Sequence, residues 1–60
     1  MNVLYAILAK IPGKVWRQID EQEASTGAAA VRKTRTSQRQ RGNEYPTGTR
    51  YKALALRRNK

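Results

Sequence analysis

Residues 25–56 read STGAAAVRKTRTSQRQRGNEYPTGTRYKALAL, and this stretch decides the predicted fold. It begins with Ser25 and Thr26, either of whose hydroxyls can accept a hydrogen bond from the amides that open a helix. We therefore predict a basic helix over residues 27–41 that stops at Gly42. Only the first turns of this helix carry apolar side chains, so its later part has little to pack with.

The end of the same stretch is typical of a β-hairpin. The sequence Tyr45-Pro46-Thr47-Gly48 places proline and glycine where a type I turn needs them. Residues 51–57 then alternate, with Leu54 and Leu56 on one face, which predicts a strand. Its partner is predicted to be a short strand over residues 43–45. Residues 43–60 are thus interpreted as a hairpin followed by a basic tail.

The first 24 residues are predicted to form an apolar helical anchor. Their aliphatic side chains recur at the spacing of one helix face, at Val3, Leu4, Ile7, Leu8 and Ile11. Pro12 and Gly13 end this first helix, and a second helix is expected from residue 14 to about residue 24. We interpret Trp16 as the anchor of a small core, in preference to a base-stacking residue. The whole chain is expected to form one domain.

Charge gives the strongest indication of function. The 60 residues include 13 basic and 4 acidic side chains, for a net charge of +9. Residues 25–60 hold ten of the bases and only one acid, Glu44, so this half accounts for the entire net charge. Soluble surfaces usually mix both signs, and such an asymmetry indicates an anionic partner for one half of the molecule.

Two other partner classes fit less well. The chain has no cysteine and no histidine, so disulfides are excluded, and we expect no metal, no cofactor, no catalytic residue and no enzymatic activity. Absence of cysteine fits a reducing, cytoplasmic compartment. The apolar run of residues 3–11 is far shorter than the roughly 20 residues that span a membrane. We therefore expect a nucleic-acid partner, with a larger assembly or a protein partner as a further option.

Residues 25–56 also resemble part of a known family. A basic helix, then Gly42, then a hairpin with Gly48 and Tyr51 in a G-x-x-Y pattern resembles the small phage-type winged helix-turn-helix proteins. The resemblance covers residues 14–56 and rests on common residue types. It implies a mainly α fold with a small C-terminal hairpin, and DNA binding through a recognition helix and a wing.

Helical geometry assigns roles within that helix. With Val31 facing inward and about 100° per residue, Arg35 falls near the inward direction, so the helix is expected to project beyond the core after about Thr34 or to fold only on its target. The outward side chains are candidates for base contact: Lys33, Thr36 and Gln40. The flanking and remaining bases are candidates for phosphate contact: Arg32, Arg35, Arg39, Arg41, Arg50, Lys52, Arg57 and Arg58.

Two alternatives remain open at this point. The segment RKTRTSQRQR also resembles arginine-rich RNA-binding segments, as in small basic ribosomal proteins that thread an extension through structured RNA. In that interpretation Tyr45 and Tyr51 could stack on bases, although packing against the helices is favoured. A third hypothesis is a phage-like inhibitor that binds host RNA polymerase. DNA is narrowly favoured over RNA.

Overall fold

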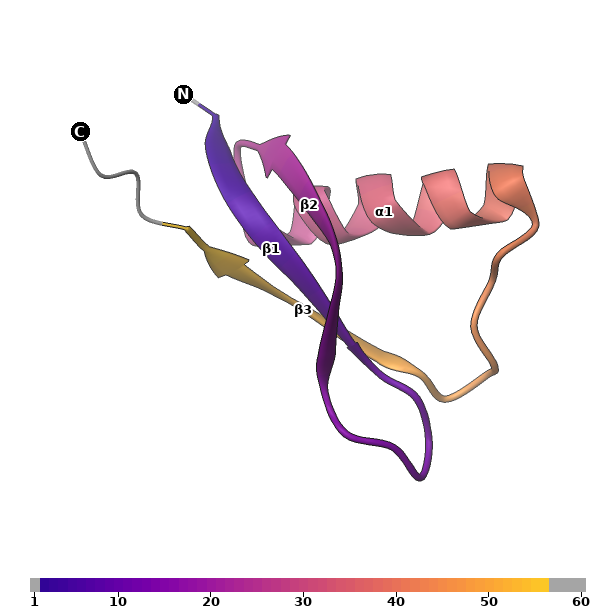
Figure 1. The fold of residues 1–60 in the computed structure, drawn as a ribbon. Coiled ribbons are helices and arrows are strands. Elements are labelled where there is room, and N and C mark those ends of the chain that lie inside the picture. Colours follow the sequence, from indigo (N-terminus) through magenta and orange to yellow (C-terminus); the bar gives the residue numbers. More distant parts are fainter. Residues whose placement is uncertain (1, 57–60) are drawn as a thin grey trace.

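The computed structural model describes residues 2–56, which form a three-stranded antiparallel sheet with one helix packed against one of its faces (Figure 1). In chain order the elements are β1 (Val3–Lys10), β2 (Arg17–Ala24), α1 (Gly27–Arg41) and β3 (Arg50–Ala55). The strand order is β2-β1-β3, so β1 is the central strand. The mainly α, winged helix-turn-helix-like fold predicted above is therefore wrong, because this is a small α/β domain.

The two helices predicted in residues 1–24 are the strands β1 and β2. A short apolar run such as VLYAILAK fits a helix or a buried strand equally well by periodicity. The segment that follows decides between them. Gly13 has a φ of 80°, and the Lys14 N–H donates to the Ile11 carbonyl at 2.9 Å. Pro12 and Gly13 thus form a tight turn that returns the chain antiparallel to itself.

A β-bulge interrupts the pairing of β1 with β2. Ile7 lies opposite Asp20 and Leu8 lies opposite Gln18, which leaves Ile19 without a partner in the ladder. Side chains of a regular strand alternate between faces, and one extra residue shifts that alternation. The shift allows Ile19 to pack with the core beneath α1, although Asp20 beside it also faces α1, where it accepts from Thr34.

The core between α1 and the sheet is small and lined mostly by alanine. Its buried members are Ile7, Ala24 and Ala30, with partly buried side chains packed around them. Trp16 is only half-buried and lies outside this cluster, so its interpretation as the core anchor is wrong. Ile7, with no exposed surface, is the largest fully buried side chain among the described residues.

Small residues let α1 approach the sheet closely. A Cβ added to Gly27 would lie only 3.3 Å from the Ala53 Cβ, which is tighter than ordinary contact. One turn further along, Ala30 has no exposed surface. This close packing explains why alanine and glycine, rather than larger aliphatic residues, occupy the first turns of the helix.

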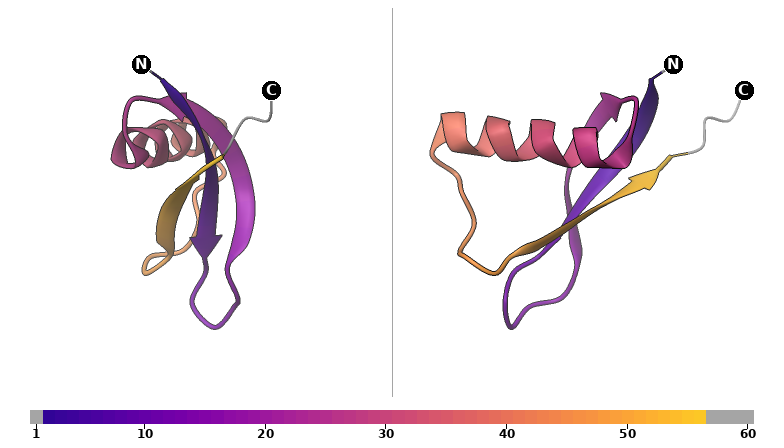
Figure 2. Two further views of the ribbon diagram at one scale, coloured as in Figure 1. Left: turned by 90° about the vertical axis from the view of Figure 1, so that its left-hand side faces the viewer. Right: turned by 180° about the vertical axis from the view of Figure 1, so that it is seen from behind.

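The ends of α1 follow the sequence prediction. Its bounds are those expected, and the Thr26 Oγ1 accepts from the Ala29 N–H at 3.1 Å. Gly42 ends it in the left-handed conformation, with a φ of 72°, as is common at helix C-termini. The later turns extend beyond the strands in both Figure 1 and Figure 2, and the last buried residue is Thr34.

The predicted wing is also wrong. Residues 43–45 form no strand, and β3 pairs instead with β1, with Tyr5 opposite Ala55. Two of the predicted wing contacts, Arg50 and Lys52, therefore lie on an edge strand of the sheet. The loop before β3 contains a turn in which the Thr49 N–H donates to the Pro46 carbonyl at 3.2 Å.

The face of the sheet opposite α1 is covered by no other element of residues 2–56 (Figure 2). We name it the open face. Strand alternation and register assign to it these side chains of the three strands: Leu4, Ala6, Leu8 and Lys10 of β1, Gln18, Glu21 and Glu23 of β2, and Lys52, Leu54 and Arg50 of β3.

Candidate nucleic-acid interface

Basic side chains dominate the described surface. Residues 2–56 contain ten of them, and all ten are exposed. Within these residues only one salt bridge forms, between Arg39 and Glu44. The ten are Lys10, Lys14, Arg17, Arg32, Lys33, Arg35, Arg39, Arg41, Arg50 and Lys52. Their charges are therefore largely uncompensated by acidic side chains within the fold.

The inward side of α1 differs from the one predicted. Ala30 and Thr34 are buried against the sheet, whereas Val31 is only partly buried. At about 100° per residue, Arg32 and Arg39 then point almost directly away from the sheet, and Thr36 lies within about 40° of that direction. All three are exposed. Arg32 moves from a flanking position in the sequence prediction to the outermost position in the structure.

A row of three arginines runs along α1 between its outermost side and the flank that faces β3. Arg32 begins the row, followed by Arg35, whose Cζ lies 5.3 Å from the centre of the Tyr51 ring. Arg39 completes it, with its Nε 3.1 Å from the Glu44 Oε1. Arg35 is exposed and lies on a flank of the helix, not near the inward direction where the sequence geometry placed it. Ion pairs this exposed contribute little to stability, so Arg39 remains available to another anion.

Two tyrosines support the part of α1 that extends past the sheet. The Tyr51 hydroxyl donates to the Gln38 Oε1 at 3.3 Å, and the rings of Tyr45 and Tyr51 stack with their centres 6.5 Å apart. Burial raises the pKa of Tyr51 above 10.0, and the nearby Arg35 charge only partly offsets this. Tyr51 thus packs against the helix, as favoured above over base stacking.

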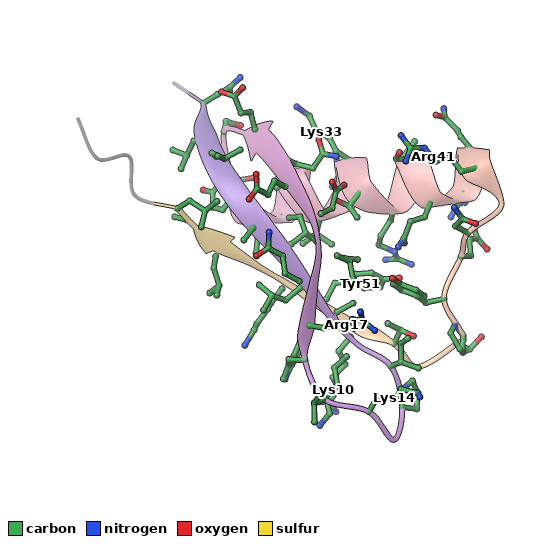
Figure 3. The ribbon with its side chains drawn as sticks, in the orientation of Figure 1. Lys10, Lys14, Arg17, Lys33, Arg41 and Tyr51 are labelled. Atoms are coloured by element: carbon green, nitrogen blue, oxygen red, sulfur yellow. The ribbon has the colours of Figure 1, made fainter. Side chains whose placement is uncertain are left out.

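The flank of α1 that faces β2 carries the remaining base-contact candidates. The Lys33 Nζ donates to the Glu23 carbonyl at 2.7 Å, so this ammonium already has a partner in the fold. The Gln40 side chain is exposed and makes no hydrogen bond within residues 2–56. Figure 3 shows Lys33 and Arg41 along the same helix, and Arg41 lies near enough to Asp20 to influence its titration.

Asp20 links β2 to the middle of α1. Its Oδ2 accepts from the buried Thr34 hydroxyl at 3.0 Å and from the Gln22 amide at 2.8 Å. Burial alone would raise the pKa of this carboxyl, but hydrogen bonds from Gln22, the Glu21 N–H and Thr34 outweigh it. The pKa therefore lies below its ordinary value of 3.8, and the charged carboxylate fixes how α1 is rotated on the sheet.

A second basic group lies at the end of the β1–β2 hairpin and was missed from the sequence. Figure 3 shows Lys10, Lys14 and Arg17 in this region, and Arg50 of β3 lies opposite Lys10 in the ladder. The zero net charge of residues 1–24 concealed these bases. The Pro12-Gly13 turn is the signal that could have revealed them, because a hairpin there brings the residues on its two sides together.

Two further predicted contacts belong to the basic tail. Arg57 and Arg58 lie outside the described residues. Residues 2–56 contain no group of three or more carboxylates that could hold a metal ion. Within the same residues, no helix has the length and apolar character needed to cross a membrane.

Comparisons with protein-family profiles, curated proteins and solved structures gave no match. What this surface does must therefore be inferred from its own residues.

Proposed function

We propose that this chain is a non-enzymatic nucleic-acid-binding protein that contacts duplex DNA through the exposed side of α1. The observation that carries the proposal is the composition of that side. Residues 32–41 hold five exposed basic side chains, and α1 contains no acidic residue. Bases that neutralise phosphates release condensed counterions, which is the main source of affinity for DNA.

The shape of the helix supports duplex DNA over structured RNA. A helix is about 10–12 Å across with its side chains, and the major groove of B-DNA, about 12 Å wide, admits it. The major groove of A-form RNA is too deep and narrow for such an approach. The later turns of α1 extend past the sheet (Figure 1), which gives them room to enter a groove.

Roles within this surface follow from the direction of each side chain. Arg32 and Thr36 point away from the sheet and would face the base edges, with Gln40 beside them. Arg35, on the flank that faces β3, and Arg39, near the end of the helix, would reach phosphates. Arginine pairs with guanine and glutamine with adenine through two hydrogen bonds each, so Arg32 and Gln40 are the proposed reading residues.

A charge-matched comparison tests the proposal. We expect Arg32→Ala with Arg35→Ala to lower affinity for labelled duplex DNA by at least about tenfold and to reduce the salt slope by about one, because Arg35 is the phosphate contact of this pair. The control is Lys14→Ala with Arg17→Ala, which removes the same charge from the hairpin end. Fluorescence anisotropy at several salt concentrations measures both. Equal losses in the two double variants would contradict a site on α1.

An alanine scan over residues 32–41 separates DNA from RNA as the partner. On duplex DNA, we expect a periodic profile in which Gln40→Ala relaxes preference at one base pair by roughly 1–3 kcal/mol. Lys33→Ala should have a smaller effect, because its ammonium is bound to the Glu23 carbonyl. A flat profile together with tighter binding to structured RNA would favour the RNA-threading alternative instead.

A further inference from the structure

The open face carries the leucines of β1 and β3, whereas the core beneath α1 has one large fully buried side chain, Ile7. Leu4 and Leu8 of β1 lie there half-buried. Leu54 of β3 is 49% exposed, and within residues 2–56 only Val15 is a more exposed large apolar residue. A strand that is apolar on both faces is typical of a fully buried strand, and β1 has this composition. The sequence of β1 thus suits a sheet that is covered on both sides.

Charge on the open face differs from charge on α1. The open face has two acids, Glu21 and Glu23, against three bases, Lys10, Arg50 and Lys52. It is therefore close to neutral, whereas α1 has five bases and no acid. A near-neutral apolar surface is suited to a protein partner rather than to a polyanion.

The charges of the open face lie at opposite corners. Glu23 lies beside Leu4 and Glu21 beside Ala6, at the end of the sheet where β1 begins. Lys52 lies beside Leu8 and Arg50 beside Lys10, on the opposite edge strand and toward the opposite end. The acidic corner and the basic corner thus lie at the two ends of one diagonal of the sheet, with leucines between them.

We propose that a second copy of this chain covers the open face, in a two-fold dimer whose sheets pack face to face. A two-fold axis along the other diagonal of the face exchanges the two charged corners, so each copy sets its acids against its partner's bases. Strands then cross at close to 90°, which is one of the two observed classes of sheet packing. The five bases of α1 remain on the outer sides of such a dimer, away from the interface.

The area of the open face sets the expected affinity of the dimer. Three strands about 4.8 Å apart, two of eight residues and one of six, cover at most roughly 14 by 26 Å. This is less than the roughly 800 Å² that each partner contributes to a standard interface. We therefore expect a weak dimer that forms at micromolar or higher concentration, more fully in moderate salt, which screens repulsion between the two basic copies.

A charge-swap experiment tests this dimer independently of nucleic-acid binding. One variant carries Glu21→Lys and Glu23→Lys, and the other carries Arg50→Glu and Lys52→Glu. In a dimer of either variant alone, charges of the same sign face each other at both corners. We therefore expect the association constant of each variant to fall by at least about tenfold. Their equimolar mixture restores opposite charges at both corners and should dimerise. Sedimentation equilibrium up to millimolar concentration measures all three, and circular dichroism checks the fold of each variant.

Several outcomes would overturn the proposal. A wild-type chain that stays monomeric at millimolar concentration refutes the dimer, as does a mixture of folded variants that fails to associate. If either variant is unfolded, dilution of the wild-type chain followed by NMR decides, since amide signals of Leu4, Leu8 and Leu54 should shift while those of Arg32 and Thr36 do not. Dissociation of the dimer by duplex DNA would also overturn it, because the open face would then bind DNA.

Discussion

Ile7 and Leu8 are neighbours in β1, yet they lie in very different surroundings. Ile7 is fully buried beneath α1, among alanines that bring the helix close to the sheet. Leu8 is half-buried on the open face, which no described element covers. The helix-covered face buries Ile7 and its neighbouring alanines completely, whereas the open face leaves its leucines partly exposed. Stability of the single chain should therefore depend on the first face far more than on the second.

The largest expected effect is the loss of the one large buried side chain. Ile7→Ala should lower the free energy of unfolding by about 2–5 kcal/mol, which is comparable to the whole stability of so small a domain. Thermal unfolding followed by circular dichroism measures it, at a concentration where the chain is monomeric. The matched control is Leu54→Ala on the open face, for which we expect less than about 1 kcal/mol. Equal losses at the two positions would refute the contrast between the faces.

Enlarging a small residue probes the close approach of α1. Ala30→Leu should destabilise by about 1–3 kcal/mol, because the added atoms have no space between helix and sheet. Ala28→Leu adds the same atoms at an exposed position of the same helix and should change stability by less than about 0.5 kcal/mol. Chemical denaturation of both variants gives the comparison, and an unaffected Ala30 variant would contradict the tight packing.

The Asp20 carboxylate should make the helix-covered face sensitive to acid. Since the folded-state pKa of Asp20 lies below its ordinary value, its contribution is present above about pH 4 and is lost as the pH falls through the folded-state pKa. Asp20→Asn keeps an acceptor for Thr34 but loses the charge, which should cost about 1 kcal/mol near neutral pH. The variant should also lose less stability than wild type when the pH falls from 5 to 3, and an unchanged acid dependence would rule out this role.

The smallest expected effect lies on the open face. The Lys52 Nζ lies 4.5 Å from the centre of the Trp16 ring, and a contact of this kind at an exposed site contributes about 0.5–1 kcal/mol. Lys52→Met should therefore cost no more than this and should alter the fluorescence of Trp16. Arg50→Met removes a neighbouring charge of the same strand without touching the ring, and it should leave the emission unchanged. Identical spectra for the two variants would argue against the contact.

Local signals in the sequence predicted α1 correctly and placed a strand at β3, but they missed β1, β2 and the pairing of all three strands. The helix is marked at both ends by residues that act within a few positions, the hydroxyl of Thr26 and the left-handed Gly42. The strands depend on pairing between distant residues, such as Tyr5 with Ala55, and no local pattern reports that. The apolar run of β1 was equally compatible with a helix, and the interpretation of Pro12-Gly13 as a helix stop concealed a hairpin turn.

The candidate site was predicted in composition but not in orientation. Its basic residues on α1 are exposed as expected, including Lys33, which is bound to a backbone carbonyl. The inward direction was placed at Val31 because valine is the largest apolar side chain of that helix. The structure places Thr34 inward instead, because Asp20 supplies the buried hydroxyl with a hydrogen-bond partner. A polar residue with such a distant partner cannot be recognised as buried from helical periodicity.

The bulge at Ile19 has a consequence for how this chain can change in length. The bulge reverses the alternation of β2, so that Asp20 lies opposite Ile7 and Gln18 lies opposite Leu8. Removing Ile19 alone would restore a regular ladder and leave every other side chain of β2 on its present face, at the loss of one side chain packed against the core. Removing a residue elsewhere in β2 while the bulge persists would exchange the faces of part of the strand. The hairpin can therefore lose a residue at the bulge or change length at its Pro12-Gly13 tip, but not elsewhere in β2, without mixing the contents of its two faces.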